Sequence, residues 1–231
     1  MNERGIIYRI EKVKYSLPDT DPLVIATNLV VPSYVSFLSG LAYHHSTTQI
    51  PVVTQVVTSR TKKSVNGNGE VRFIKFDRNK MFGFKKERME NGYTSVGGIE
   101  KVIVDGLFLP RYCPISETFG AMEGIDTAKL IRYGKKMSSI VTLKRMGYLL
   151  SLYGIDVYDE LRDRLNNRYD LLNPSLPPSG EKDRKWRLKV NEAIKTEEVI
   201  PIYKDVPPYL LVVMNLSEIM AEKIRAIYTR D

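Results

Sequence analysis

The sequence contains few of the side chains on which most catalytic and metal sites depend. Among its 231 residues there is one cysteine, Cys113, and there are two histidines, His44 and His45. A single cysteine excludes internal disulfides and cysteine-based zinc sites, and we expect Cys113 to be a buried structural thiol. The two histidines are adjacent at the end of a predicted helix, so their side chains diverge. Packing or capping at the helix end is therefore expected, rather than metal binding.

Several catalytic signatures are also missing. The sequence contains no G-x-S-x-G nucleophile elbow and no H-E-x-x-H zinc motif. The glycines at Gly67-x-Gly69 and Gly97-Gly98 lack the spacing of a phosphate-binding loop. The carboxylates Glu100, Asp105 and Asp126 are expected on helix surfaces or at helix caps. We therefore predict no catalytic residue, no metal and no cofactor, in a protein that is not an enzyme.

Long apolar runs are absent as well. No stretch reaches the roughly 18 to 20 residues of a membrane-spanning helix, and the N-terminus MNERGIIYRIEK lacks the apolar core of a signal peptide. We therefore expect a cytoplasmic protein without a membrane partner. The hydrophobic content of 43% and the charged content of 27% are typical of a folded domain rather than a disordered chain.

What the sequence has in excess is positive charge. The formal net charge is +8, which favours an acidic partner, with nucleic acid as the first candidate. A further basic group at residues 182–189 is interspersed with acidic residues. Alternatively, each group lies on a solvated surface and has no binding role. A modest excess of lysine is common in heat-adapted proteins and needs no acidic partner. As nucleic-acid contacts we predict three groups: Arg9, Lys12 and Lys14; Arg60, Lys62 and Lys63; and Lys85, Lys86 and Arg88.

The spacing of apolar residues predicts an α+β fold in which small antiparallel β hairpins pack with several helices. Alternation over residues 5–17 predicts a two-stranded ribbon that turns near Glu11. Pro32 and Ser33 predict the start of a helix that extends to about His45, with Ser33 as its cap.

A second hairpin and a series of helices are predicted downstream. Strands are expected at residues 52–58 and 70–76, and the turn signal Asn66-Gly67-Asn68-Gly69 between them predicts that they pair as a hairpin. A loop at 173–180 precedes a short strand at 186–190. Helices are expected at 99–109, 114–122, 127–136 with Asp126 as cap, from Ser138-Ser139 to Gly154, and at 157–165.

The C-terminal residues predict a strand followed by a helix. Residues 209–214 are a short apolar run behind Pro207-Pro208, which is typical of a buried strand. Ser217 can cap the next helix, in which apolar residues recur at helical spacing. A strand–helix appendage is therefore expected at this end of the chain.

Seven short segments between residues 5 and 191 carry a family resemblance. They are Val31 to His45, Gln49-Ile-Pro51, Val56-Val-Thr58, Phe82-Gly83, Gly98-Ile-Glu-Lys101 with Asp105, Lys144-Arg-Met-Gly-Tyr-Leu-Leu150, and Lys185-Trp-Arg-Leu-Lys-Val-Asn191. In this order and spacing the segments resemble AbiEi-like antitoxins. These proteins are transcriptional regulators of abortive-infection toxin–antitoxin operons in bacteria and archaea.

The resemblance implies a division of the chain into parts. Family members join an N-terminal winged helix-turn-helix, which binds operator DNA, to a C-terminal domain that counters the toxin or aids DNA binding. Residues 1–30 resemble the wing of that module, whose recognition helix would lie before Met1, and residues 31–191 resemble the antitoxin C-terminal domain. A wing supplies phosphate contacts, whereas base reading belongs to the recognition helix.

Residues 192–231 carry a second resemblance, to AbiEii-type nucleotidyltransferase toxins, which are the partners of these antitoxins. It rests on residues 198–209 and 216–230, including the pattern A-E-K-x-x-A-x-x-x-R. The resemblance implies that Lys223 and Arg230 are vestiges of a motif near a toxin active site. The R-D-x-Y-D motif and the carboxylates that would hold Mg²⁺ are missing, so it implies a remnant rather than an enzyme.

Together, the resemblance and the charge predict an antitoxin-like transcriptional regulator of a prokaryotic viral-defence system. We expect it to act through protein and DNA contacts, with a cognate nucleotidyltransferase-type toxin or operator DNA as partner and a homo-oligomer as a further option. Two alternatives stay open. One is a degenerate antitoxin–toxin fusion that serves as an interaction module, and the other is a nucleotidyltransferase-like enzyme.

Overall fold

The computed structural model describes residues 7–12, 14–17, 20–67 and 69–194. The chain divides into two units, residues 1–195 and 196–231, and every described residue belongs to the first. The expected strand–helix appendage, with Lys223 and Arg230, lies outside the described residues. The expected boundaries near residues 30 and 191 stay predictions.

The fold class is α+β, as predicted. The helices are α1 Pro22–Asn28, α2 Phe37–Tyr43, α3 Ile99–Phe108, α4 Ile115–Gly120, α5 Thr127–Met137, α6 Ile140–Leu152 and α7 Tyr158–Leu161, with short 3-10 turns at Arg78–Lys80, Pro110–Tyr112 and Arg162–Arg164. The strands are β1 Tyr8–Glu11, β2 Lys14–Ser16, β3 Ser33–Val35, β4 Val53–Thr58, β5 Val65–Gly67, β6 Gly69–Lys75, β7 Phe84–Met89, β8 Gly92–Gly97, β9 Asp170–Leu171, β10 Glu181–Asp183 and β11 Leu188–Val190.

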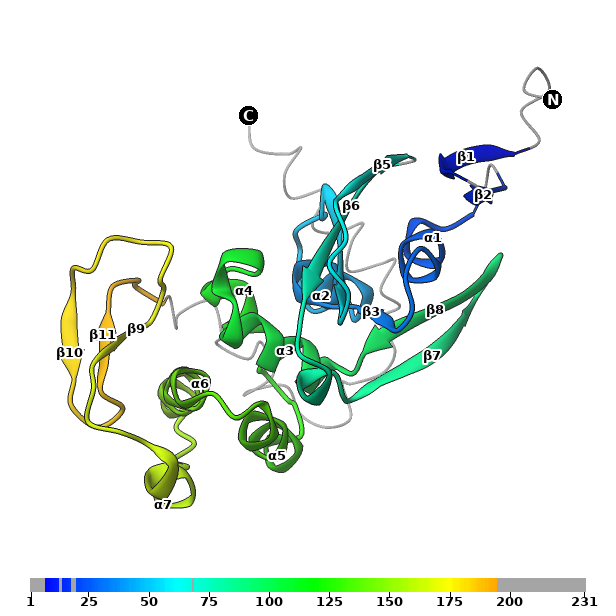
Figure 1. Ribbon diagram of the computed structural model, residues 1–231. Helices are drawn as coiled ribbons and strands as arrows, with labels where there is room; N and C mark the ends of the chain where they lie inside the picture. The colour runs from blue at the N-terminus through cyan, green and yellow to red at the C-terminus, as the bar shows by residue number, and fades with distance from the viewer. Residues whose placement is uncertain (1–6, 13, 18–19, 68, 195–231) are drawn as a thin grey trace, which may run out of the picture. The chain divides into compact units, whose positions relative to one another are not determined.

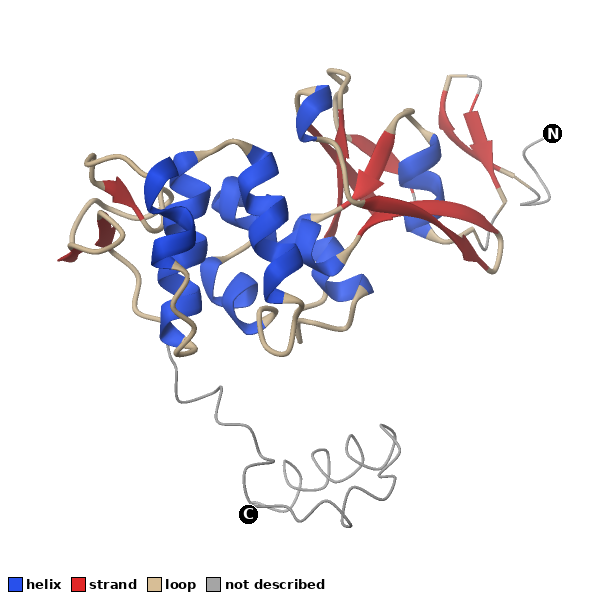
Figure 2. Ribbon diagram, turned by 90° about the horizontal axis from the view of Figure 1, so that it is seen from below, coloured by secondary structure: helices blue, strands red, loops and turns tan. Residues whose placement is uncertain are grey.

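A six-stranded mixed sheet organises the first half of the chain, in the order β5-β6-β4-β3-β8-β7. Side chains alternate between the two faces of a strand. On one face Val56 and Val71 pack against Ala26 of α1, and on the other Tyr34 contacts Asp105 of α3. Figure 1 shows α1 beside β8, with the β1–β2 hairpin next to it. Figure 2 shows the helices that follow the sheet gathered at the end of the fold opposite the N-terminal hairpin.

The predicted N-terminal ribbon is confirmed, because β1 and β2 pair antiparallel around a turn after Glu11. The predicted hairpin of 52–58 with 70–76 is wrong: β4 and β6 lie side by side but run parallel. The turn signal at 66–69 is nevertheless used, since it joins β6 to β5, a short antiparallel strand that the sequence pattern did not suggest. The loop thus contains a strand of its own, and the chain crosses over before β6 begins.

The predicted helix from Pro32-Ser33 begins later than expected. Ser33–Val35 is strand β3, fully buried between β4 and β8, and α2 begins at Phe37 with Ser36 at its N-cap position. The β-branched and aromatic residues of this segment suit a central strand, and the two flanking strands satisfy its backbone groups. Tertiary pairing therefore overrides the helical pattern here.

The helices of the second half are largely as predicted. Asp126 caps α5 by accepting a hydrogen bond from the backbone of Lys129, and Ser139 caps α6 through Thr142. The helix expected at 157–165 is shorter, because α7 is followed by a 3-10 turn. The strand expected at 186–190 begins at Leu188, because the two preceding residues form a turn.

The thiol of Cys113 is 1% exposed, which confirms the expected buried role. Burial raises its pKa to about 12, so the reactive thiolate is scarce near neutrality. We expect the native protein to resist an aromatic disulfide reagent at about pH 8 and to react with one equivalent after unfolding in guanidinium. Rapid labelling of the native protein, followed by absorbance, would contradict this burial.

Candidate nucleic-acid interface

The carboxyl end of helix α1, residues 27–29, joins the parts of the chain that carry the predicted basic groups. Asn28 donates a hydrogen bond of 2.8 Å from Nδ2 to the backbone carbonyl of Tyr93 in β8. The ammonium of Lys14 in β2 donates to the carbonyl of Leu29. A cation is favoured at this position because the carbonyls at the end of a helix carry partial negative charge. The N-terminal hairpin and the β7–β8 hairpin therefore meet at the α1 end.

The sequence signals for this helix are local. Asp21 caps it through the backbone of Leu23, and Pro22 occupies its first turn. Aspartate followed by proline is a typical helix start, yet the sequence analysis predicted no helix here.

An ion pair attaches the N-terminal hairpin to the loop after β4. The ammonium of Lys62 contacts the carboxylate of Glu11, and Lys14 lies 3.4 Å from the same carboxylate. The hydrogen bond from Lys62 is the main reason why the pKa of Glu11 is lowered. The structure therefore brings the first two basic groups together, while Glu11 offsets part of their charge.

Hydrogen bonds through Thr58 connect the backbone of Arg60 to Pro32, the residue before β3. Thr58 Oγ1 donates a 2.9 Å hydrogen bond to the carbonyl of Pro32 and accepts one of 3.3 Å from the backbone of Arg60. Val31, next to Pro32, is 64% exposed. Arg60 and Lys63 are both exposed. The loop after β4 thus presents its cations beside the segment that follows the α1 end.

The third basic group lies on β7, the edge strand of the sheet. Strand alternation places Lys86 and Arg88 on one face, and Lys85 with Glu87 on the other. Lys85 pairs with Glu87 at 2.5 Å, whereas the ammonium of Lys86 lies 4.3 Å from the ring centroid of Tyr93. The charge of this group is therefore concentrated on the face that carries Lys86 and Arg88.

The elements that carry the predicted residues are thus attached to the α1 end, and we call these residues together the α1 basic surface. Lys86 and Arg88 lie on the face of the sheet opposite α1, because Thr94, whose side chain bonds to α1, points to the other face. Strands β3 and β8 separate β4 from β7. Within the sheet, three strand spacings amount to about 14 Å. The members of the α1 basic surface are Arg9, Lys12 and Lys14 of the N-terminal hairpin, Arg60, Lys62 and Lys63 after β4, and Lys85, Lys86 and Arg88 of β7.

Tyr93 lies on the same face as Lys86 and Arg88 and was missed by the sequence interpretation, as was the whole β7–β8 hairpin. It is 50% exposed and lies opposite Arg88 in the pairing register. The signal was present, because Asn91-Gly92 between two alternating segments is a strong hairpin signature.

Two of the carboxylates expected on helix surfaces are buried instead. Glu100 is 5% exposed, and its Oε2 lies 2.8 Å from the ammonium of Lys129. Asp105 is 0% exposed and contacts the ammonium of Lys101. Both expectations were wrong because α3 packs between the sheet and helices α5 and α6, so it has almost no surface. Asp126 is a cap, as expected.

The Lys101–Asp105 pair is a structural cluster. Asp105 Oδ2 accepts hydrogen bonds from Tyr34 at 3.0 Å and from Ser36 at 2.8 Å. The ammonium of Lys101 lies 4.6 Å from the ring centroid of Phe82. Burial lowers the pKa of Lys101 and raises that of Asp105. Since both side chains are fully buried, solutes do not reach them, and the cluster joins α3 to β3.

His44 follows the last residue of helix α2, and His45 is the next residue. His44 Nε2 lies 2.7 Å from the carbonyl of Gly97, so it packs at the end of α2 as predicted. In the described part of the chain, no group of three or more histidine, cysteine, aspartate and glutamate side chains could hold a metal ion. None of the helices described there is long and apolar enough to cross a membrane.

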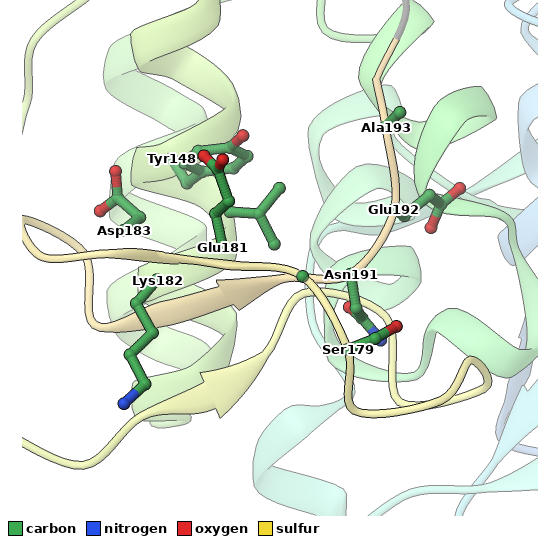
Figure 3. Close-up of a pocket in the computed structure, with 10 residues that line it drawn as sticks. Tyr148, Ser179, Glu181, Lys182, Asp183, Asn191, Glu192 and Ala193 are labelled. Carbon is green, nitrogen blue, oxygen red and sulfur yellow. The ribbon is translucent and has the colours of Figure 1, made fainter.

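A cavity of about 510 Å³ lies between α6 and the β10–β11 hairpin. Its lining includes Glu181, Asp183 and Glu192. Figure 3 shows Glu181 beside Tyr148 and Asp183 on the same side of the hairpin, while Lys182 points to the other side. Two of the carboxylates have structural roles. Asp183 accepts a hydrogen bond from the backbone of Trp186, and Glu192 accepts one from the side-chain amide of Asn173. The predicted site residues are not among those that line it.

A comparison of the sequence with models of known protein families found no match, and a comparison with curated proteins found none either. The resemblance to AbiEi-like antitoxins therefore rests on the quoted residues. Several of those residues have structural roles here, including Lys101 and Asp105 in the buried cluster and Lys144, which pairs with Asp170 at 2.8 Å.

Proposed function

We propose that this protein is an antitoxin-like regulator that contacts nucleic acid through the α1 basic surface. The observation that supports the proposal most directly is the convergence at the α1 end. Lys14 donates to the carbonyl of Leu29, and Asn28 donates to the backbone carbonyl of Tyr93, so the two hairpins that carry cations far apart in the sequence are attached to one helix end. A surface of this kind follows a phosphate backbone, which supplies most of the affinity in non-specific binding.

The charge balance of the surface supports the same proposal. Glu11 and Glu87 offset one lysine each, Lys62 and Lys85, out of nine predicted cations. The N-terminal hairpin has the form expected of a wing, and a wing contacts phosphates and the minor groove rather than reading bases. We therefore place operator DNA on this surface, in a cytoplasmic protein, with a cognate nucleotidyltransferase-type toxin as the protein partner.

The proposal is tested by the salt dependence of DNA binding. Each phosphate contact contributes about −0.9 to the slope of log K against log salt. Replacing Arg60, Lys86 and Arg88 with glutamine is expected to reduce the slope by about 3 and to weaken binding at low salt. Fluorescence anisotropy of a labelled duplex, measured between about 50 and 300 mM KCl, gives both quantities.

A matched control separates local contacts from net charge. The variant Lys182→Gln, Arg184→Gln and Lys185→Gln removes the same number of charges from the exposed residues around β10, and we expect it to retain the wild-type slope. Binding that does not change with salt in the wild-type protein would refute the proposal. An equal loss of slope in the control would assign the effect to net charge alone.

A further inference from the structure

We infer that the β7–β8 hairpin holds a stacking site for an unpaired base of a single-stranded nucleic acid, with Tyr93 as its platform. The inference rests on the proposed function and adds a contact to it, because a base can stack on this ring only where it is unpaired, whereas phosphate contacts accept duplex and single strand alike. It concerns Tyr93 together with Lys86 and Arg88.

The three side chains share one face of the hairpin. Arg88 is directly opposite Tyr93 in the antiparallel register, and Lys86 is opposite Ser95, two positions along the same face. The ammonium of Lys86 lies over the ring of Tyr93 at 4.3 Å from its centroid. An aromatic ring beside two cations is an arrangement in which a base can stack while its flanking phosphates are neutralised.

Tyr93 is also unusually exposed for an aromatic residue of this sheet. It is 50% exposed, whereas Tyr34 on β3 is 0% exposed. Lys86 covers the ring from one side, and the exposed half of the residue leaves room for a base. Alternation directs Thr94, its neighbour in β8, to the opposite face, where it is buried under α1. The strand therefore divides into a buried face and a binding face.

The backbone at Tyr93 is held before any ligand arrives. Asn28 fixes its carbonyl, and Thr94 Oγ1 donates to the carbonyl of Leu23 at 3.0 Å and lies 3.1 Å from Thr27 Oγ1. Gly92 has φ +144, and a side chain there would meet Val24 at 2.8 Å. Such a preorganised ring loses little conformational freedom on binding.

The test compares two substitutions of Tyr93. Tyr93→Phe keeps the ring, whereas Tyr93→Leu keeps a large apolar side chain but removes the aromatic face. For a labelled oligodeoxythymidine we expect binding to weaken about tenfold with leucine and less than about twofold with phenylalanine. The salt slope is expected to be unchanged in both, since no charge is lost. Thermal unfolding checks that both variants are folded.

Three ligands decide what the site accepts. We expect Tyr93→Leu to weaken binding of oligodeoxythymidine or oligouridine, and the one that binds the wild-type protein more tightly identifies the natural strand. Binding of a blunt duplex is expected to be unchanged. Equal losses for phenylalanine and leucine, or an equal loss for the duplex, would overturn the stacking site. Displacement by polyglutamate as effective as by oligodeoxythymidine would also overturn it, in favour of an acidic peptide on the β7 edge.

The outcomes also separate this inference from the proposed function. Salt-dependent binding that is unchanged by substitution of Tyr93 would overturn the stacking site but not the proposed function of the α1 basic surface. Absence of salt-dependent binding to every nucleic acid would overturn both.

Discussion

Asp105→Ala is expected to destabilise the protein by about 3–5 kcal/mol, because it removes one partner of a buried ion pair. Lys101 would keep a buried positive charge without its carboxylate. Tyr34 and Ser36, which donate to Asp105 at 3.0 and 2.8 Å, would lose their acceptor. Urea unfolding followed by circular dichroism measures the change, and a loss of this size is a large fraction of the stability of an ordinary domain.

Apart from Asp105, the ammonium of Lys101 is surrounded by aromatic rings. The ammonium lies 4.6, 5.4 and 5.5 Å from the ring centroids of Phe82, Phe76 and Tyr34. Rings stabilise a cation through their faces, but each contributes far less than a desolvated carboxylate. The cage therefore depends on Asp105 for charge balance.

Two further variants make the test selective. Asp126→Ala removes an exposed N-cap and is expected to cost about 1 kcal/mol. The double variant Lys101→Met with Asp105→Ala removes both charges, and we expect it to be more stable than Asp105→Ala alone. If Asp105→Ala costs no more than Asp126→Ala, the buried pair does not have the role assigned to it.

Gly147→Ala is expected to destabilise the protein by about 3 kcal/mol and to expose Trp186. A Cβ at residue 147 would lie 2.6 Å from Cζ2 of Trp186 and closer still to two other ring atoms. Trp186 is 1% exposed and is held through its backbone by Asp183, so the rigid ring has little freedom to move aside. The substitution therefore separates α6 from the turn that carries Trp186.

Whether Gly147→Ala lowers or raises the stability of the protein distinguishes the clash from helix propensity. Alanine in a helix is favoured over glycine by about 1 kcal/mol, so without the clash the same substitution would stabilise α6. Gly120→Ala is the matched control, since a Cβ there would meet no atom of the described residues within 4 Å. Trp186 is the single tryptophan of the chain, so a red shift of its fluorescence reports its exposure. An unchanged spectrum and higher stability for Gly147→Ala would contradict the close packing.

The helices show which parts of the fold could be predicted. Asp126 and Ser139 cap α5 and α6 through residues three positions ahead, and the antiparallel ribbon of β1 and β2 turns within a few residues. In each case the partners are near in the sequence, so side-chain type and spacing suffice.

The sheet shows where prediction failed. The turn signal at 66–69 was interpreted as joining residues 52–58 to 70–76, but those strands run parallel, and β5 takes the place of the expected partner. Ser33–Val35 became a central strand because β4 and β8 flank it. A local signal fixes a turn, whereas the strand that pairs with it is chosen by packing over long sequence distances.

The basic residues of the candidate site were chosen from the sequence, but their arrangement could not be predicted from it. The sequence by itself determined the excess of cations, their grouping, and the caps of the later helices, since these follow from residue type and local spacing. Only the tertiary structure decided that Lys14 and Tyr93 meet at one helix end and that Lys101 and Asp105 are buried. The same charged residue can be solvated or enclosed, because its environment is set by elements that are distant in the sequence.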